Sequence, residues 1–202
     1  MTTAQRQRSG TAEQILDLAE ALIQTRGYSA FSYQDIADRL GIRKASIHYH
    51  FPSKTDLGTA VVDRYVARFG AALTAIAADQ AQSSMAMLDF YIGPYLEFAD
   101  ASDRICLCGA LAGEILALPA EFRSRVDGFF RTHHAWLADI LKRGAARGEF
   151  RLAAPATKLA RFIFAALQGA LLVQRTTGDP AELRDVITVM KLQLAGGGAN
   201  PQ

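Results

Sequence analysis

The chain has 202 residues, half of them hydrophobic and 21% charged, which is enough apolar surface for a globular core and too little charge for long disorder. Its formal net charge is +2, and residues 1–55 carry this excess, with seven Lys or Arg against five Asp or Glu. These figures exclude a globally basic protein, so any contact with a polyanion must come from a local surface. The polar N-terminus and the lack of a long uncharged apolar run predict neither a signal peptide nor a transmembrane helix, so we expect a cytoplasmic protein.

Residues that favour helices dominate the chain and alternating strand patterns are missing, so the sequence predicts an all-α fold of about nine helices. Three pairs of residues resemble capping boxes and predict helix starts: Thr11 with Gln14, Ser32 with Asp35, and Ser53 with Asp56. In chain order we expect helices over residues 11–26, 33–40, 44–50, 54–79, 84–100, 104–117, 119–147, 155–178 and 180–195.

The short helices lie at the start of the chain and the long ones follow. Three helices within residues 1–53 predict a compact head. The helix that begins at residue 54 joins this head to a larger helical body, which extends to residue 195. The glycine-rich end, residues 196–202, is predicted to be disordered.

The second and third predicted helices have the spacing of two helices that pack at a steep angle around a glycine turn. Ile36 and Ala37 lie on one face of the first of these helices, and Ile47 returns an apolar side chain from the second. Gly41 makes the turn, because a left-handed backbone conformation costs glycine least. On its own this spacing fits a DNA-reading helix-turn-helix and a helical hairpin without a ligand equally well.

The side of the third helix that Ile47 does not use favours the DNA-reading alternative. Ala45 and Ser46 are small enough for close approach to the floor of a groove, and Ala can touch a thymine methyl group. Arg43 and Lys44 precede them and can meet phosphates or guanine edges. Arg6 and Arg8, before the first helix, are expected to reach the DNA backbone or a minor groove.

Residues 11–57, TAEQILDLAEALIQTRGYSAFSYQDIADRLGIRKASIHYHFPSKTDL, resemble the N-terminal domain of the TetR family of bacterial transcriptional regulators. The resemblance implies a homodimer that places its third helices in successive major grooves of a near-palindromic double-stranded operator, about 34–36 Å apart. One departure is that His48 stands where the family most often has a phosphate-binding tyrosine. The expected DNA-contacting residues are Ser32, Tyr33, Arg43, Lys44, Ala45, Ser46, His48, Tyr49, His50 and Lys54.

Residues 158–175 are apolar on more than one face and rich in small residues, which permit close approach of helices. Together with residues 183–194 they predict half of an intermolecular four-helix bundle, which is where TetR-like proteins dimerise. An internal core helix would give the same pattern and would allow a free monomer. The expected dimerisation residues are Phe162, Ala166, Gly169, Ala170, Val173 and Val186.

Aromatic residues accumulate between positions 90 and 136; most belong to the core, and some are expected to line a small-molecule pocket. Cys106, close to Arg104 and to a predicted helix start, is expected to have a raised thiolate fraction. Its segment also resembles a TetR subgroup in which several members respond to electrophiles, oxidants or unsaturated small acids. Alternatively, Cys106 and Cys108 are small buried hydrophobes. The expected ligand-binding residues are Tyr91, Tyr95, Cys106, Phe129, His133 and Trp136.

The sequence therefore predicts a sequence-specific DNA-binding regulator, a repressor that a small-molecule effector releases from its operator. The alternative is a thiol-based regulator that senses through Cys106. We expect no enzyme, because phosphate loops, dinucleotide fingerprints and nucleophile elbows are missing. A helical module for a protein partner would leave the basic head unexplained. We expect no cofactor, no membrane contact and no metal, since neighbouring His133 and His134 diverge by about 100° on a helix.

Overall fold

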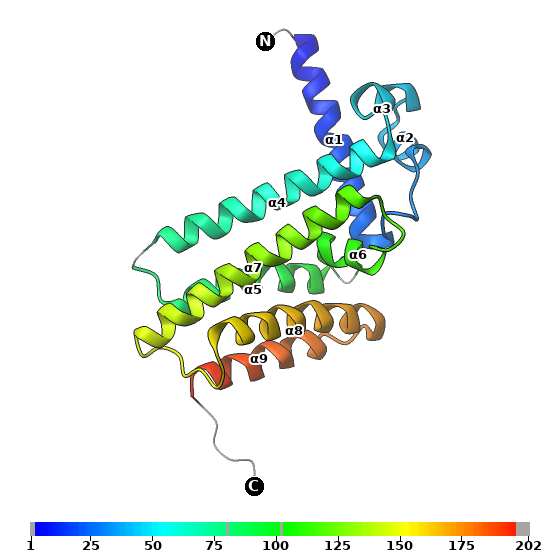
Figure 1. Cartoon of the computed structure of the whole chain (residues 1–202). Helices are drawn as coiled ribbons and strands as arrows, with labels where there is room; N and C mark the ends of the chain where they lie inside the picture. The colour runs from blue at the N-terminus through cyan, green and yellow to red at the C-terminus, as the bar shows by residue number, and fades with distance from the viewer. Residues whose placement is uncertain (1–2, 80, 102, 197–202) are drawn as a thin grey trace. The chain divides into compact units, whose positions relative to one another are not determined.

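The structure, a computed structural model, describes residues 3–79, 81–101 and 103–196, and their side chains from residue 10 onward. The side chains of Arg6 and Arg8, and the predicted tail beyond residue 196, lie outside this description. Within the described ranges the chain forms nine helices and no strand, which confirms the all-α class (Figure 1). These are α1 (Thr3–Arg26), α2 (Tyr33–Leu40), α3 (Lys44–His50), α4 (Lys54–Ala78), α5 (Ser84–Asp100), α6 (Leu107–Gly113), α7 (Ala120–Ala146), α8 (Ala156–Thr177) and α9 (Ala181–Leu194).

Two predicted helices were wrong in extent, whereas the other seven agree to within one residue at each end. α1 begins at Thr3, not at Thr11, because the residues before Thr11 include good helix formers that extend the helix. The helix expected over 104–117 is only α6. Beyond α6 the amide of Glu114 donates to Leu111 O at 3.1 Å, and the amide of Ala117 donates to Glu114 O at 2.8 Å. Such bonds over three residues form tight turns, so the helix ends there.

Close packing divides the chain into two compact units. Unit 1 consists of residues 1–67 and 107–127, and unit 2 consists of residues 68–106 and 128–202. α4 and α7 are continuous helices whose first parts belong to unit 1 and whose later parts belong to unit 2. Unit 1 is larger than the head expected from residues 1–53, because α6 and the start of α7 pack with it.

In unit 1, α1, α2 and α3 pack against one another (Figure 1). α2 starts with the predicted capping box, in which the amide of Ser32 donates to Asp35 Oδ2 at 2.7 Å and Ser32 Oγ accepts from the amide of Asp35. It ends at Gly41, whose φ of 64° is left-handed. The fully buried apolar side chains of these helices are those of Ile15, Ala19, Leu22, Ile23, Ile36 and Ile47.

Arg64 of α4 ties α1 to α4 within the same unit. Its guanidinium lies 2.7 Å from a carboxylate oxygen of Asp17, 3.0 Å from one of Glu13 and 3.1 Å from one of Glu20. The three acids are spaced by three or four residues along α1, so they share one face of that helix. One cation thus holds the register between α1 and α4.

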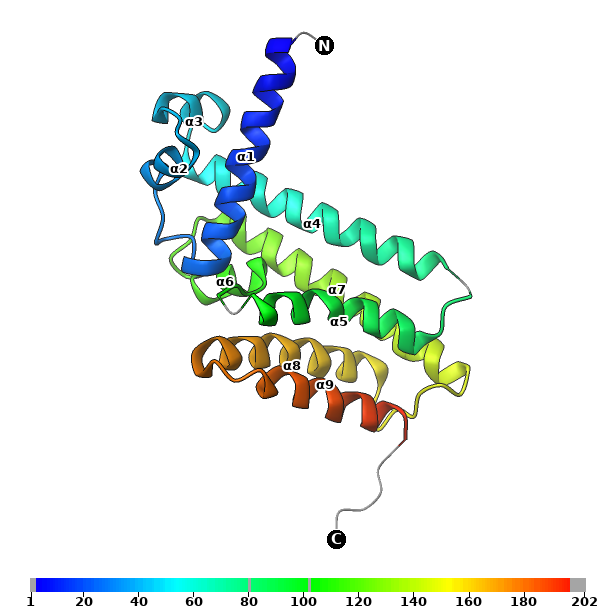
Figure 2. The same cartoon turned by 180° about the vertical axis from the view of Figure 1, so that it is seen from behind.

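In unit 2, α8 and α9 lie side by side in both views, and α5 packs against α8 (Figures 1 and 2). The core of this unit includes Met87, Leu88, Ile92, Leu137, Ile163, Leu167 and Leu183. α8 is the one helix of the described residues that is long and apolar enough to cross a membrane by length and composition alone. Within unit 2, 39% of its most apolar window is buried.

Candidate nucleic-acid interface and effector site

α3 turns one face to the core of unit 1 and the other to solvent. Ile47 is fully buried. The solvent face consists of exposed Arg43, Lys44, Ala45, His48 and Tyr49, with half-buried Ser46 and His50 beside them. A surface hollow of about 370 Å³ is lined by Ala45, Ser46, Tyr49, His50 and, from α1, Thr11. The small side chains of Ala45 and Ser46 therefore belong to a concave, solvent-facing surface on the side of α3 that Ile47 does not use.

Tyr33 is the predicted contact that the structure places in the interior. It is only 8% exposed, and its hydroxyl lies 2.8 Å from Phe51 O and 2.6 Å from Ser53 O. Burial and the negative charge of Asp56 raise its pKa to about 12, so the hydroxyl keeps its proton and donates it to these carbonyls. Tyr33 therefore fixes the turn between α3 and α4.

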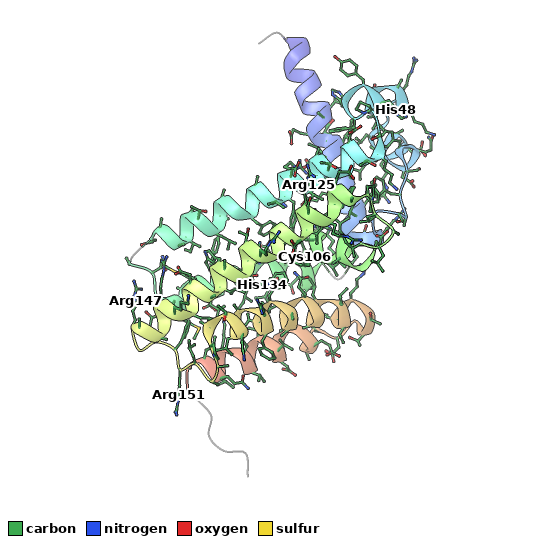
Figure 3. All side chains as sticks on the ribbon, in the orientation of Figure 1. His48, Cys106, Arg125, His134, Arg147 and Arg151 are labelled. Atoms are coloured by element: carbon green, nitrogen blue, oxygen red, sulfur yellow. The ribbon has the colours of Figure 1, made fainter. Side chains whose placement is uncertain are left out.

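His48, labelled in Figure 3, is exposed and packs its ring edge-on against Tyr33, with ring centroids 4.8 Å apart. Its Nδ1 lies 3.1 Å from Pro52 O. A carbonyl oxygen can only accept, so Nδ1 carries a proton and Nε2 is the atom left for an outside group. A phosphate oxygen also accepts, and His48 can therefore donate to one only when Nε2 is protonated as well.

Lys54 begins α4 and is held by two aromatic rings of unit 1. Its Nζ lies 4.6 Å from the ring centre of Tyr28 and 4.5 Å from that of Phe31. Partial burial lowers the pKa of Lys54, while the carboxylate of Glu114 acts in the opposite direction. Lys54 is thus anchored inside the head as well as placed beside α3.

Ser32 is exposed, and its hydroxyl lies 2.6 Å from Asp35 Oδ2.

In unit 2 the structure brings five of the six predicted ligand residues into one cluster. The Tyr91 ring of α5 stacks on Trp136 of α7 with an interplanar angle of 16°, and the Phe129 ring lies 3.9 Å from that of His133. Tyr95 lies 6.0 Å from Tyr91, ring to ring. We call Tyr91, Tyr95, Phe129, His133 and Trp136 the aromatic cluster.

A chain of hydrogen bonds crosses the aromatic cluster. Gln168 Nε2 donates to the Tyr95 hydroxyl at 3.1 Å, and the Tyr91 hydroxyl lies 3.0 Å from His133 Nδ1. Burial raises the pKa of Tyr91 well above its usual value, with smaller contributions from Tyr95. Burial likewise lowers the pKa of His133 to about 4. Tyr91 and His133 are therefore uncharged at neutral pH, and their polar groups are paired with each other inside the aromatic cluster.

The two cysteines are free thiols, and both are buried. Cys106, labelled in Figure 3, precedes α6, is 4% exposed and interacts electrostatically with Tyr91. Cys108 lies in α6 and is fully buried. Through this effect on Tyr91, Cys106 influences one member of the aromatic cluster. Arg104 is exposed, and its guanidinium lies 3.9 Å from the carboxylate of Asp103.

The outer face of α8 and α9 is apolar and open. Phe162 is 58% exposed and Val173 is 44% exposed, while Ala166, Gly169 and Val186 are half-buried. A groove of about 290 Å³ on this face is lined by Phe162, Ala166, Val186, Val189, Met190, Asp185 and Gln193. Ala170, also predicted for this face, is buried in unit 2. We call the exposed apolar side of α8 and α9 the outer face.

Sequence reasoning did not identify two features of unit 1. The first is the contact of Glu114 with the amides of Tyr28 and Ser29, and the second is the acidic row that holds Arg64. The spacing of the three acids on α1 was a detectable signal. Acidic residues that share one face of a helix repel one another, so a cationic side chain beside them is expected. The role of Glu114 had no local signal, since its partners lie more than 80 residues away.

Known proteins agree with this architecture. The family model for bacterial regulatory proteins of the tetR family matches residues 15–61, and the model for tetracyclin repressor-like C-terminal domains matches residues 85–190. A TetR-family regulator structure from Agrobacterium tumefaciens is 36% identical, covers 93% of this chain and 98% of its own, and superposes with a TM-score of 0.86.

Two curated relatives extend over nearly the whole chain. An uncharacterized HTH-type transcriptional regulator from Lactococcus lactis is 29% identical and covers 90% of this chain and 91% of its own. The HTH-type transcriptional repressor DhaR from a Mycobacterium species is 24% identical and covers 91% of each chain. With two family models that together match most of its length, this chain belongs to the TetR family of helix-turn-helix, DNA-binding transcriptional regulators.

Proposed function

We propose that this regulator is a homodimeric repressor that acts in the cytoplasm and inserts its two α3 helices into successive major grooves of a near-palindromic operator. The observation that carries the proposal is the division of α3, with Ile47 in the core and a basic, small and aromatic face in solvent. In this proposal residues 1–53 bind DNA, and residues 54–195 bind the effector and the second copy.

The predicted contacts have two roles in the proposal. Direct contacts to bases and phosphates come from residues that are exposed or border the hollow: Ser32, Arg43, Lys44, Ala45, Ser46, His48, Tyr49 and His50. Tyr33 and Lys54 position α3 and the start of α4, because the hydroxyl of one and the ammonium of the other are held within the head. Base contacts of this kind each contribute about 1–3 kcal/mol of discrimination.

Selection of bound sequences from random duplexes by the purified protein tests this function. We expect a near-palindromic motif with half-sites one helical turn apart, and an affinity that falls steeply with salt. Ala45→Glu is expected to abolish binding, because a carboxylate would face the groove floor and phosphates. Failure of the wild-type protein to retain any duplex in dilute buffer would refute the proposal.

The aromatic cluster supports an effector site in unit 2. Effector sites in helical bundles are mostly apolar with a few well-placed polar groups. Tyr91, His133 and Gln168 provide such groups, and Trp136 and Phe129 provide the walls. An effector that binds the released form more tightly shifts the population away from DNA only as far as that preference allows. Titration of Trp136 fluorescence, followed by an operator-release assay with the same compound, tests this step.

A second candidate is thiol-based sensing through Cys106, a free thiol just before α6 whose charge contributes, after burial and Tyr95, to raising the pKa of Tyr91. Here an electrophile modifies the Cys106 sulfur, and the added group displaces the packed cluster. N-ethylmaleimide is a suitable probe: release of the operator should persist in Cys108→Ser and vanish in Cys106→Ser. Equal release of the operator in both variants would exclude sensing through Cys106. The proposal that the protein binds an operator would stand.

A further inference from the structure

His48 lies on a different stripe of α3 from the residues that line the hollow. Residues four apart on a helix share a face, so His48 lies one turn after exposed Lys44. Its ring packs against Tyr33 of α2, and its Nδ1 reaches Pro52 O, in the turn that leads into α4. Base edges form the floor of a major groove and phosphates form its rims. With Ala45 toward the bases, the stripe of Lys44 and His48 therefore faces the phosphates of one rim.

Only one ring nitrogen of His48 is available to DNA. Nδ1 lies 3.1 Å from Pro52 O, which can only accept, so Nδ1 carries a proton in both the neutral and the cationic ring. Nε2 has no hydrogen-bond partner within the residues that the structure describes. In the neutral ring Nε2 offers a lone pair, which repels a phosphate oxygen. In the imidazolium it offers an N–H, which forms a charge-assisted hydrogen bond to the same oxygen.

The acids around His48 do not hold a proton on its ring. Among the described residues, no carboxylate oxygen lies within 4.0 Å of a ring nitrogen of His48. The carboxylates on the surrounding helices have other partners: Asp35 bonds to Ser32, Asp38 to Gln34 and Asp56 to Ser53, and the three acids of α1 lie on Arg64. A phosphate would therefore be the first anion to meet Nε2.

The remaining titratable groups near His48 do not supply its proton either. Lys44 on the same stripe is exposed and opposes a second positive charge there. Tyr33 keeps its proton and is neutral, and Lys54 of α4 lies over two aromatic rings. His50 borders the hollow, on the other stripe of α3. The C-terminal end of α3 favours a cation, but this helix has only seven residues. DNA is thus the partner that changes the protonation of His48.

We propose that His48 contacts an operator phosphate only as an imidazolium, so that each head takes up one proton from solvent as it binds DNA. The inference rests on the proposed operator binding and adds a regulation by pH to it. An unperturbed histidine is mostly neutral above about pH 6.5. Because the phosphate stabilises the protonated ring, operator affinity rises as the pH falls, and by reciprocity DNA increases the affinity of the ring for its proton.

Fluorescence anisotropy of the full chain on the selected operator, at pH 8, 7 and 6 and at one salt concentration, tests this coupling. Lysine and arginine side chains stay charged across this range. We expect the dimer to bind about tenfold to a hundredfold more tightly at pH 6 than at pH 8, because both copies contribute. Calorimetry at pH 7 in two buffers of different ionisation enthalpy should show an uptake of about one proton per dimer.

Two matched variants assign the proton to one histidine. His48→Gln offers an amide N–H at every pH, so it should bind about equally at pH 6 and pH 8, and its proton uptake should vanish. His50→Gln makes the same change on the other stripe and should keep the gain at pH 6.

A gain in affinity that persists in His48→Gln overturns the proposal. So does a wild-type affinity that stays constant or falls toward pH 6; a fall would mean that neutral Nε2 accepts from a base amino group. In each of these cases operator binding itself stands. If the wild type binds no duplex at any pH, the operator function fails together with this proposal.

Discussion

The carboxylate of Glu114 accepts hydrogen bonds from the backbone amides of Tyr28 and Ser29, at 2.7 and 2.9 Å. Both amides follow Gly27, which ends α1 with a left-handed φ of 92°. A side chain at Gly27 would strain this left-handed backbone and would push the Glu114 carboxylate away from the two amides. One side chain from the end of α6 therefore fixes the loop by which α1 leads into the helix-turn-helix.

Glu114→Gln is expected to lower the free energy of unfolding by about 1–2 kcal/mol, because one charged acceptor of two amides is replaced by a neutral group with a single acceptor oxygen. Urea unfolding followed by circular dichroism measures this loss. Operator affinity should also fall, since the loop before α2 loses its anchor. Glu97→Gln, at an exposed position on α5, is the matched control and should change neither quantity. Equal stability of the two variants would show that Glu114 does not hold the loop.

Lys44→Ala is expected to weaken operator binding about threefold to tenfold and to reduce the steepness of the salt dependence by about one unit of slope. The reason is that Lys44 is exposed at the start of α3, where it can neutralise one phosphate. Fluorescence anisotropy with the selected operator at several salt concentrations gives both quantities. Lys158→Ala removes the same charge from the exposed surface of α8 and should retain the wild-type slope. An unchanged slope in Lys44→Ala would place that lysine away from the phosphates.

Local chemistry explains why the helix-turn-helix could be predicted. The capping box of Ser32 and Asp35, the turn at Gly41 and the spacing of Ile47 are all encoded within a few residues. The role of Tyr33 was not predictable in the same way. Its position at the start of α2 suggested a DNA contact, but its hydroxyl bonds to Phe51 O and Ser53 O, and burial depends on packing that no short pattern reveals.

The body shows the same division between local and tertiary information. The sequence predicted α5, α7 and α8, and it named Tyr91 and Trp136 among the expected ligand-binding residues; that their rings stack on each other is a finding of the structure. Composition could not tell which side of α8 is open, because small residues occur on both sides. Ala170 thus belongs to the core, while Phe162 on the same helix is exposed.

Folding stability is expected to decrease below neutral pH because of His133. The folded protein holds the pKa of this group at about 4, against 6.5 for an unperturbed histidine. The unfolded chain therefore binds a proton first as the pH falls, so stability is lost from about pH 6.5 downward and the loss is complete near pH 4. Between pH 7.5 and pH 5 this one group should account for a loss of about 2 kcal/mol.

The His133 contribution is measured as the difference between two proteins. Urea unfolding of wild type and of His133→Gln at pH 7.5 and pH 5 should show a smaller loss in the variant, by about 2 kcal/mol. His50→Gln makes the same substitution in α3, outside the aromatic cluster, and should retain the wild-type pH dependence. A His133→Gln variant with an unchanged pH dependence would mean that the imidazole is charged in the folded state.

Phe162→Glu is expected to convert the protein into a monomer. Phe162 is 58% exposed, and it lies on the outer face with Val189 and Leu192, which are 52% and 54% exposed. Apolar side chains so open to water at adjacent helices are typical of a surface that a second copy covers, and a buried carboxylate at its centre would be strongly unfavourable. Sedimentation velocity at several protein concentrations measures the change, which should be accompanied by a large loss of affinity for the full operator but a small one for a half-site.

Leu116→Glu is the control for this experiment, because Leu116 is 89% exposed but lies after α6, in unit 1 rather than on the outer face. It should remain a dimer with wild-type operator affinity, which separates loss of the interface from a general effect of an added charge. If the Phe162→Glu protein sediments as a dimer, the two copies must contact each other through a surface other than the outer face. The half-site spacing recovered from the random duplexes would then have to be explained from that surface instead.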